Sequence, residues 1–249
     1  MRRSWWVLAT VVLAAGYVWL AAAEARDREA ARPELAPIGV TVDPNGPIGP
    51  AKLAGGGFDF AAIRWSPTDR AKTAAATERI RRDTGLEYAF FLASENARAG
   101  SFDTLAADYP KDRWLRYKGK PLVYVFGGKA ESSASAEDPR FSIIRIDNAR
   151  GGDQYWISNP PNLKNGLLTL TSSFSGAGLS IDPRRTGKAL DQQELFADTN
   201  RDRVALLLWY SWNSKDGSAL LPDLVGDSAN PPSYAYDRVK AFNERWKRP

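Results

Sequence analysis

Residues 204–222 read VALLLWYSWNSKDGSALLP, and this stretch decides the fold. Its first seven residues form an almost unbroken apolar run, which ends in a polar loop that contains glycine. An apolar run of this length, closed by turn residues, is typical of a parallel strand covered on both faces. In folds built from such strands, binding and catalytic groups lie on the loops that follow the carboxyl ends of the strands. The loop that begins at Ser211 is therefore the first candidate for a site.

That loop carries an aromatic ring, an amide, a cation and a carboxylate, supplied by Trp212, Asn213, Lys215 and Asp216. Proteins that hold sugars use this set of groups. Asn, Ser, Asp and Gly are also the residues that any turn favours. Residue types alone therefore leave two interpretations open, a sugar site and an ordinary strand end.

The segment resembles the closing strand of the endo-α-mannosidase-like glycoside hydrolases (family 99) and their WbsX-like bacterial relatives. Those proteins carry Ser-Trp-Asn-Glu-(Trp/Tyr)-x-Glu-Gly there, and this chain has Ser-Trp-Asn at residues 211–213. Residues 117–126, YKGKPLVYVF, are similar to the family's Tyr-x-x-Gly-(Lys/Arg)-Pro followed by an apolar strand. The resemblance extends over about residues 37–246. It implies a carbohydrate ligand and a retaining mechanism in which the 2-hydroxyl of the substrate takes part.

The catalytic loop departs from the family pattern. Ser214 or Lys215 stands at the position of the first glutamate, and Asp216 meets the second if one residue is deleted. Leu221 replaces the glutamate of the Ile-Glu-Pro turn. An aspartate carboxylate sits one methylene closer to the backbone, and a displacement of about 1 Å can cost about a hundredfold in rate. The resemblance therefore supports the fold and the ligand class better than it supports turnover.

The composition limits the chemistry. The chain of 249 residues has no His and no Cys, which excludes Ser-His triads, Cys nucleophiles, His- or Cys-ligated zinc and disulfides. Paired carboxylates remain available, and glycosidases use them. We expect no metal and no cofactor. The formal net charge of +5 is modest and the basic residues are scattered, so we expect no nucleic-acid partner.

The N-terminus has the pattern of an export segment. Arg2 and Arg3 precede an uncharged run over residues 4–23, and charges resume at Glu24. About 20 apolar residues can span a bilayer, whereas a signal-peptide core has about 7–15. Residues 1–23 are predicted to be a signal peptide or a membrane anchor, and residues 24–36 a tether. The arginines predict a domain outside the cytoplasmic membrane, in the periplasm, secreted or anchored, with membrane contact through this segment alone.

The remaining residues, 37–249, are predicted to form one domain in which strands and helices alternate. This order predicts a (β/α)₈ barrel of the TIM type with shortened or irregular helices, and a doubly wound sheet is the main alternative. The expected strands are residues 38–42, 58–65, 88–92, 122–126, 141–146, 155–157, 167–171 and 204–210. The expected helices are residues 68–82, 101–109, 187–198 and 233–246.

Carboxylates follow several of the expected strands: Asp43, Glu95, Asp147, Asp182 and Asp216. On a barrel these strand ends converge on one face. Glu95 and Asp216 are the predicted catalytic pair of an endo-acting glycoside hydrolase. The predicted substrate-binding residues are Asp43, Trp65, Tyr124, Trp212 and Asn213. An inactive glycan-binding barrel or envelope scaffold is the alternative function, and a structural protein without a ligand is a third. The oligomeric state is not indicated.

Overall fold

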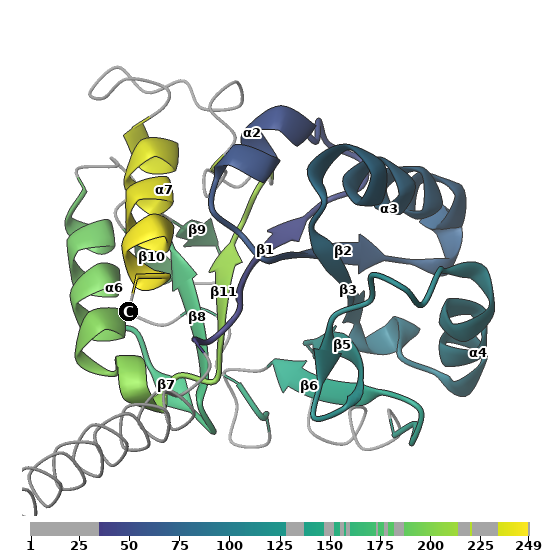
Figure 1. Ribbon diagram of the computed structural model, residues 1–249. Coiled ribbons are helices and arrows are strands. Elements are labelled where there is room, and N and C mark those ends of the chain that lie inside the picture. The colour runs from purple at the N-terminus through teal and green to yellow at the C-terminus, as the bar shows by residue number, and fades with distance from the viewer. Residues whose placement is uncertain are drawn as a thin grey trace, which may run out of the picture. The chain divides into compact units, whose positions relative to one another are not determined.

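The computed structural model describes residues 35–127, 137–146, 152–154, 157, 160–172, 174–176, 179–181, 187–213, 220 and 234–248. Within them, one sheet of nine strands forms the centre of the domain (Figure 1). Seven of its strands are parallel, and β4 (Arg116–Tyr117) and β7 (Leu163–Lys164) pair antiparallel at its edges. The parallel strands are β1 (Ile38–Val42), β2 (Phe60–Trp65), β3 (Glu87–Ala93), β5 (Lys120–Phe126), β6 (Ser142–Ile146), β8 (Leu167–Thr171) and β11 (Leu206–Tyr210).

The strand order is β6-β5-β3-β2-β1-β11-β8, so β1 lies in the middle of a curled sheet. From β1 in the middle, the chain runs to one edge of the sheet through β2, β3, β5 and β6. It then crosses to β8 on the other side of β1, and β11 fills the position between β8 and β1. A separate antiparallel pair, β9 (Phe174–Gly176) and β10 (Leu179–Ile181), follows β8.

Helices pack on the outer face of this sheet. Those in the described residues are α2 (Pro50–Gly55), α3 (Arg70–Thr84), α4 (Ala99–Asp108), α6 (Lys188–Thr199) and α7 (Tyr234–Trp246). Short 3₁₀ turns lie at Pro67–Asp69, Ser94–Asn96 and Arg201–Arg203. Gly85, with φ of 72°, ends α3 in the left-handed conformation that glycine adopts without strain.

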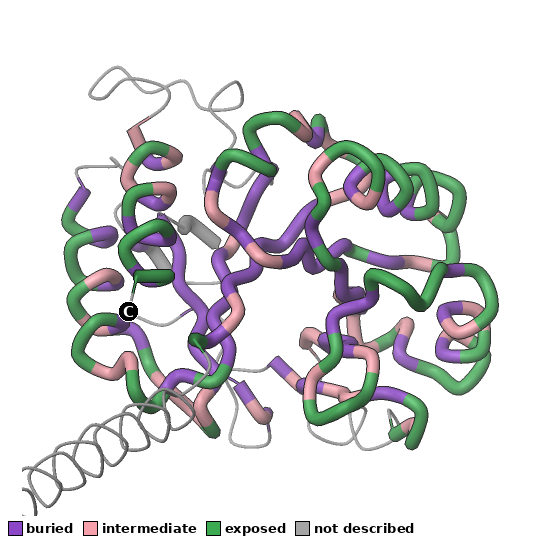
Figure 2. The backbone as a smooth tube through the Cα atoms, in the orientation of Figure 1, coloured by how far each residue is buried: buried purple, intermediate pink, exposed green. Residues whose placement is uncertain are grey.

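Alternate residues of the strands build two separate cores. Phe60 and Ala62 of β2, Tyr124 of β5 and Leu208 of β11 belong to a cluster on the concave side of the sheet. Their neighbours in sequence, such as Ile63 and Trp209, belong to a cluster between the sheet and the helices. Figure 2 shows the strands mostly buried and the outward faces of the helices exposed. Gly39 of β1 is required by this arrangement, because a Cβ there would lie 2.1 Å from the ring of Phe60.

The sheet is an incomplete version of the predicted barrel. The prediction of an α/β barrel is confirmed at this coarser level, but a complete set of eight strands and eight helices is not present in the described residues. Residues 155 and 156 of the strand expected at 155–157 lie outside the described part of the chain, and just before them a parallel bridge joins Ile146 to Gln154. Gln154 also donates from Nε2 to Oγ1 of Thr169 on β8, at 2.7 Å. Residues 152–154 therefore connect the two edges of the curled sheet without forming a strand.

No helix in the described part of the chain is long and apolar enough to cross a membrane. The predicted export segment and most of the tether, residues 1–34, lie outside that part.

Candidate functional site

A pocket of about 290 Å³ opens at the carboxyl ends of the parallel strands. Residues from the ends of β1, β2, β3, β5 and β11 line it. This is the face on which α/β barrels carry their sites, because the loops after the strands meet there. Its volume lies just below the range of about 300–1,000 Å³ typical of small-molecule sites. The lining residues are Thr41, Val42, Asp43, Ala62, Arg64, Phe91, Ala93, Phe126, Tyr210 and Ser211.

Two opposite charges face each other in the pocket. Oδ2 of Asp43 lies 3.7 Å from Nη1 of Arg64, and the Asp43 and Arg64 side chains are 31% and 61% exposed. Oδ1 of Asp43 accepts a hydrogen bond of 2.9 Å from the backbone N–H of Asn45, so this carboxylate also holds the turn after β1. Asp43 was predicted to bind substrate, and the structure places it in the pocket lining.

Aromatic rings lie beside Arg64 in the lining, because Phe91 of β3 is the register partner of Arg64 on β2. The rings of Phe91 and Phe126, at the ends of β3 and β5, stack with centroids 5.8 Å apart and planes 22° apart. Tyr210 lies at the end of β11 and is half-buried. The pocket thus combines apolar ring faces with an ion pair, which is how small polar ligands with apolar faces are held.

Tyr124 lies on the same face of β5 as Phe126, two residues before it. Its side chain is fully buried, and its ring centroid lies 6.3 Å from that of Phe91. Burial raises the pKa of the Tyr124 hydroxyl well above its usual value, and nearby Tyr117 adds to the effect. The hydroxyls of Tyr124 and Thr41 are both buried and have no hydrogen-bond partner in the described part of the chain. Tyr124, predicted to bind substrate, therefore lies beneath the lining and not in it.

Trp212 does not have the exposed position that was predicted for it. Its side chain is fully buried, its Nε1 donates to the carbonyl oxygen of Ile48, and its ring packs edge-on against Phe58 and Tyr236. It belongs to the core between the sheet and the helices. A ring enclosed in this way has no free face for a sugar, so its observed role is packing.

Asn213 is buried as well, and its amide holds the loop after β1. Its Oδ1 accepts from the backbone N–H of Asp43 at 2.7 Å, and its Nδ2 donates to the carbonyl oxygens of Asp43 and Pro47 at 2.8 and 3.0 Å. A Cβ on Gly46 would lie 2.7 Å from this Nδ2, so only glycine fits there. The predicted contact of Asn213 with substrate is corrected to a positioning role, because its amide fixes the backbone of Asp43.

Trp65 also faces away from the pocket. On β2, Ala62 and Arg64 point to the pocket, whereas Ile63 and Trp65 belong to the core under the helices. Trp65 is 2% exposed. Its predicted stacking on a sugar ring is corrected for the same reason as that of Trp212.

Of the predicted catalytic pair, the structure describes Glu95 but not Asp216. Glu95 follows β3 in the turn Ser94–Asn96, is exposed, and lies two residues beyond Ala93 of the pocket lining. Because β1 and β3 are parallel members of one sheet, Asp43 and Glu95 both follow strands at the carboxyl-terminal end of that sheet. Asp216 lies outside the described residues, as do Asp147 and Asp182. Within the described residues, no three carboxylates gather as metal ligands would.

The pocket also contains residues that the sequence reasoning missed, namely Arg64, Phe91, Phe126 and Tyr210. Arg64 carried a signal, because it is the one charge inside the apolar strand FAAIRW, and charged side chains are almost never fully buried unless they are paired. Phe126 and Tyr210 stand at the ends of apolar strands, where a run without alternation does not reveal which face a ring takes.

Comparison with solved structures supports this reading of the fold. The chain is similar to the GH99 endo-α-mannosidase from Bacteroides thetaiotaomicron, with a TM-score of 0.59 and 11% sequence identity. That match covers 79% of this chain and 77% of the other. A structure of the enzyme from the same organism in complex with bis-tris propane matches with a TM-score of 0.60 and 11% identity, covering 79% of this chain and 82% of that one. No protein-family model and no curated protein matches the sequence. The predicted resemblance is thus confirmed as a likeness of fold, and the chain has a glycoside hydrolase-like scaffold.

Proposed function

We propose that this protein binds carbohydrate in the pocket at the carboxyl ends of its strands. One observation carries the proposal: this pocket sets a stacked aromatic pair, Phe91 and Phe126, beside the charges of Asp43 and Arg64. Sugar rings offer apolar C–H faces and polar hydroxyl edges, which match these two kinds of side chain. The likeness to endo-α-mannosidases supports the same ligand class.

Glycan binding is favoured over hydrolysis by the charges in the lining. Direct glycosidase mechanisms need two carboxylates about 5–5.5 Å or about 6.5–9.5 Å apart. Among the described lining residues, Asp43 is the one carboxylate, and it faces Arg64 and holds the turn at Asn45.

Binding is tested with the full chain on a glycan array, followed by calorimetry on the best ligand. Phe126→Ala removes one ring of the stacked pair and is expected to weaken binding about tenfold or more, because stacking on an aromatic ring contributes about 1–3 kcal/mol. Phe196→Ala is the matched control, because Phe196 is half-buried on α6, against the core under the helices. If no glycan binds, or if both variants weaken binding equally, the pocket is not the sugar site.

Hydrolysis by Glu95 and Asp216 is the second candidate function. It is favoured by the position of Glu95, which lies at the pocket end of the sheet, just beyond Ala93. Incubation with mannans and bacterial exopolysaccharides, followed by chromatography of the products, tests it. Release of oligosaccharides that is lost in both Glu95→Gln and Asp216→Asn would establish an enzyme. Release that survives both substitutions would exclude this pair.

We further propose that the domain acts outside the cytoplasmic membrane, on the basis of the cationic and uncharged segments at residues 1–23. Fractionation of expressing cells tests this proposal. Recovery of the full-length protein in the cytoplasm would contradict it, and full-length protein in the membrane fraction would favour an anchor over a cleaved signal.

A further inference from the structure

We propose that the pocket selects glycans that carry an anionic group, a carboxylate or a sulfate, and that Arg64 is the residue that binds it. The inference rests on the proposed sugar-binding function and narrows its ligand class. It starts from the position of Arg64, which is the exposed residue of an otherwise buried strand and points into the pocket.

A structural role does not account for an arginine at position 64. β2 lies between β1 and β3, so Arg64 stands inside the sheet and not at an edge. The neighbouring inward residue Ala62 and the rings of Phe91 and Phe126 beside it are apolar. A small apolar or polar residue would continue the strand at this position without bringing a charge to the wall of a cavity.

The contact with Asp43 does not satisfy the guanidinium. Nη1 of Arg64 lies 3.7 Å from Asp43, beyond hydrogen-bond distance, and 61% of the Arg64 side chain is exposed. Exposed ion pairs of this kind contribute little to stability. One carboxylate oxygen of Asp43 is already engaged by the backbone of Asn45. Arg64 thus lines the cavity, and its nearest carboxylate among the described residues lies beyond hydrogen-bond distance of the guanidinium.

The chemistry of arginine points to an oxyanion. The planar guanidinium presents N–H groups in pairs that match the two oxygens of a carboxylate, sulfate or phosphate. Beside it, the Phe91–Phe126 stack can cover the ring of the sugar. An acidic sugar thus finds a partner for its charge and for its ring in one pocket.

The competing explanation is that Arg64 and Asp43 together hydrogen-bond the hydroxyls of a neutral sugar. The two explanations predict opposite effects of the Asp43 carboxylate on the affinity for the ligand. For an anionic ligand Asp43 is a repulsive neighbour, and Asp43→Asn should tighten binding severalfold because it removes a negative charge beside the site. For a neutral ligand Asp43 is an acceptor, and the same substitution should weaken binding.

The test uses pairs of oligosaccharides that differ in their charge alone. Oligogalacturonate and oligomannuronate are each compared with their carboxyl-reduced counterparts, and a sulfated galactan oligosaccharide with its desulfated form, by calorimetry on the full chain. We expect at least one anionic member to bind more than tenfold more tightly than its neutral counterpart. A preference in the uronate pairs identifies a carboxylate ligand, and a preference in the galactan pair alone identifies a sulfate.

Three variants assign the preference to Arg64. Arg64→Gln should weaken binding of the anionic member about ten- to a hundredfold and remove the preference. Arg64→Lys keeps the charge but loses the paired donors, so its affinity for the anionic member should lie between that of wild type and that of Arg64→Gln. Arg79→Gln removes one charge from the exposed face of α3 and should change nothing, which controls for attraction to the net positive chain. Thermal melts show whether each variant is folded.

Two outcomes would overturn the inference. In the first, neutral and anionic members bind equally. In the second, Arg64→Gln weakens both members by the same factor while Asp43→Asn also weakens binding. If no oligosaccharide binds, neutral or anionic, the proposed function itself is wrong. If only neutral members bind tightly, the proposed selectivity for anionic glycans is wrong and the sugar-binding function stands.

Discussion

At the scale of single residues, the hydroxyl of Tyr124 is a buried donor without a partner in the described part of the chain. An unsatisfied buried hydroxyl costs about 1–3 kcal/mol. We therefore predict that Tyr124→Phe raises the free energy of unfolding by about 1 kcal/mol in denaturant titrations. Tyr88→Phe is the matched control, because the Tyr88 hydroxyl donates to the carbonyl oxygen of Pro110 and its removal should lower stability. A stability loss in Tyr124→Phe would show that its hydroxyl is satisfied.

The same residue gives a pH signature. Burial raises the pKa of Tyr124 far above that of an unfolded tyrosine, which is about 10. Below pH 10 the hydroxyl is neutral in both states and contributes no pH dependence. Above pH 10 the unfolded chain ionises first, so stability is lost as the pH rises. Wild type should therefore lose more stability than Tyr124→Phe between pH 9 and about 11.5, and equal losses would contradict the assignment.

Residue orientation was the part of the site that the sequence did not reveal. A strand that is apolar on both faces has no alternation, so Trp65 and Trp212 read as candidates for the pocket although both pack under the helices. Arg64 is the exception, because a charge within such a strand has to reach water. The position of Asp43 was predictable, because it ends a strand and the carboxyl ends of parallel strands share one edge.

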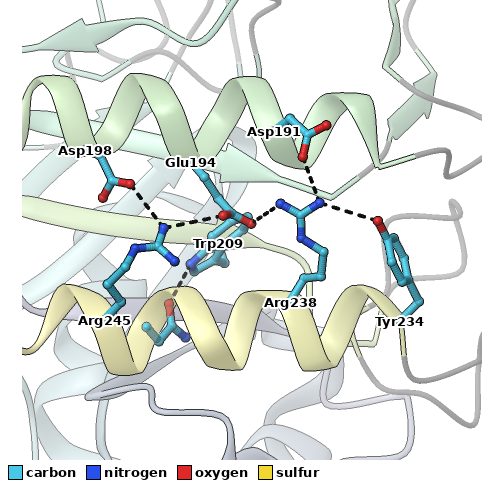
Figure 3. A network of polar contacts seen from close by, with 8 residues as sticks. Asp191, Glu194, Asp198, Trp209, Tyr234, Arg238 and Arg245 are labelled. Atoms are coloured by element: carbon cyan, nitrogen blue, oxygen red, sulfur yellow. Dashed lines mark hydrogen bonds and ion pairs between the residues drawn. The ribbon is translucent and has the colours of Figure 1, made fainter.

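At the scale of elements, ion pairs between α6 and α7 hold the outer layer on one side of the sheet (Figure 3). Glu194 of α6 is 14% exposed and lies between two arginines of α7, at 2.8 Å from Arg238 and 3.4 Å from Arg245. The arginines continue to Asp191 and Asp198 of α6, at 2.8 and 3.1 Å. Beneath them, Nε1 of Trp209 on β11 donates to Asn243 of α7 at 3.1 Å. The shared carboxylate of Glu194 is the centre of this network.

We predict that Glu194→Gln lowers the free energy of unfolding by about 1–3 kcal/mol, because it leaves two partly buried arginines without their shared charge. For a domain of this size that corresponds to a Tm lowered by about 2–4 °C per kcal/mol. Asp191→Asn is the matched control. Asp191 is 66% exposed and pairs with one arginine, so its loss should cost less than about 1 kcal/mol. Equal effects of the two substitutions would mean that the network is a set of independent surface pairs.

Most elements follow from the sequence, because their signals are local. The predicted strand at residues 38–42 and that at residues 167–171 coincide with β1 and β8, and the predicted helix at residues 68–82 overlaps α3. Helix α2 was missed, because its sequence PAKLAG follows a Gly/Pro-rich stretch that reads as a loop. It forms because proline is favoured in the first turn of a helix and Leu53 is buried in the core. Tertiary burial, and not local propensity, fixes such a short helix.

At the scale of the whole molecule, the sheet depends on a narrow seam between β6 and β8. On the β6 side, the backbone N–H groups of Asp153 and Gln154 both donate to the carbonyl oxygen of Arg145, at 2.7 and 3.0 Å. On the other side, Nδ2 of Asn165 in the β7–β8 turn donates to the carbonyl oxygen of Asp153 at 3.0 Å. Gln154 completes the seam through Thr169, and its side chain is 1% exposed. In the described residues, positions 152–154 thus join β6 to the β7–β8 side of the sheet, where a complete barrel has a strand.

A seam of this kind should open before the centre of the sheet does. β1 has parallel partners on both sides in β2 and β11, whereas β6 pairs with β5 on one side and meets Gln154 on the other. Local stability follows the number of buried contacts and paired backbone groups, so the edges have the lower opening free energy. We therefore predict that Gln154→Ala increases amide hydrogen exchange in β6 and β8 and leaves β1 and β2 at the wild-type rate under native conditions. The loss of the bond to Thr169 and of the buried side chain should also lower global stability by about 1–3 kcal/mol.

Thr169→Val is the matched variant for this prediction. It keeps the size of the side chain and removes the acceptor of the 2.7 Å bond, so it should give the same exchange pattern with a smaller amplitude. The double variant should then cost less than the sum of the two single variants, because both remove one shared interaction. Exchange that rises equally in β1 and in β6 would show that the sheet opens as one unit. In that case the curled sheet would be closed by its strands and helices together, and residues 152–154 would only cover its edge.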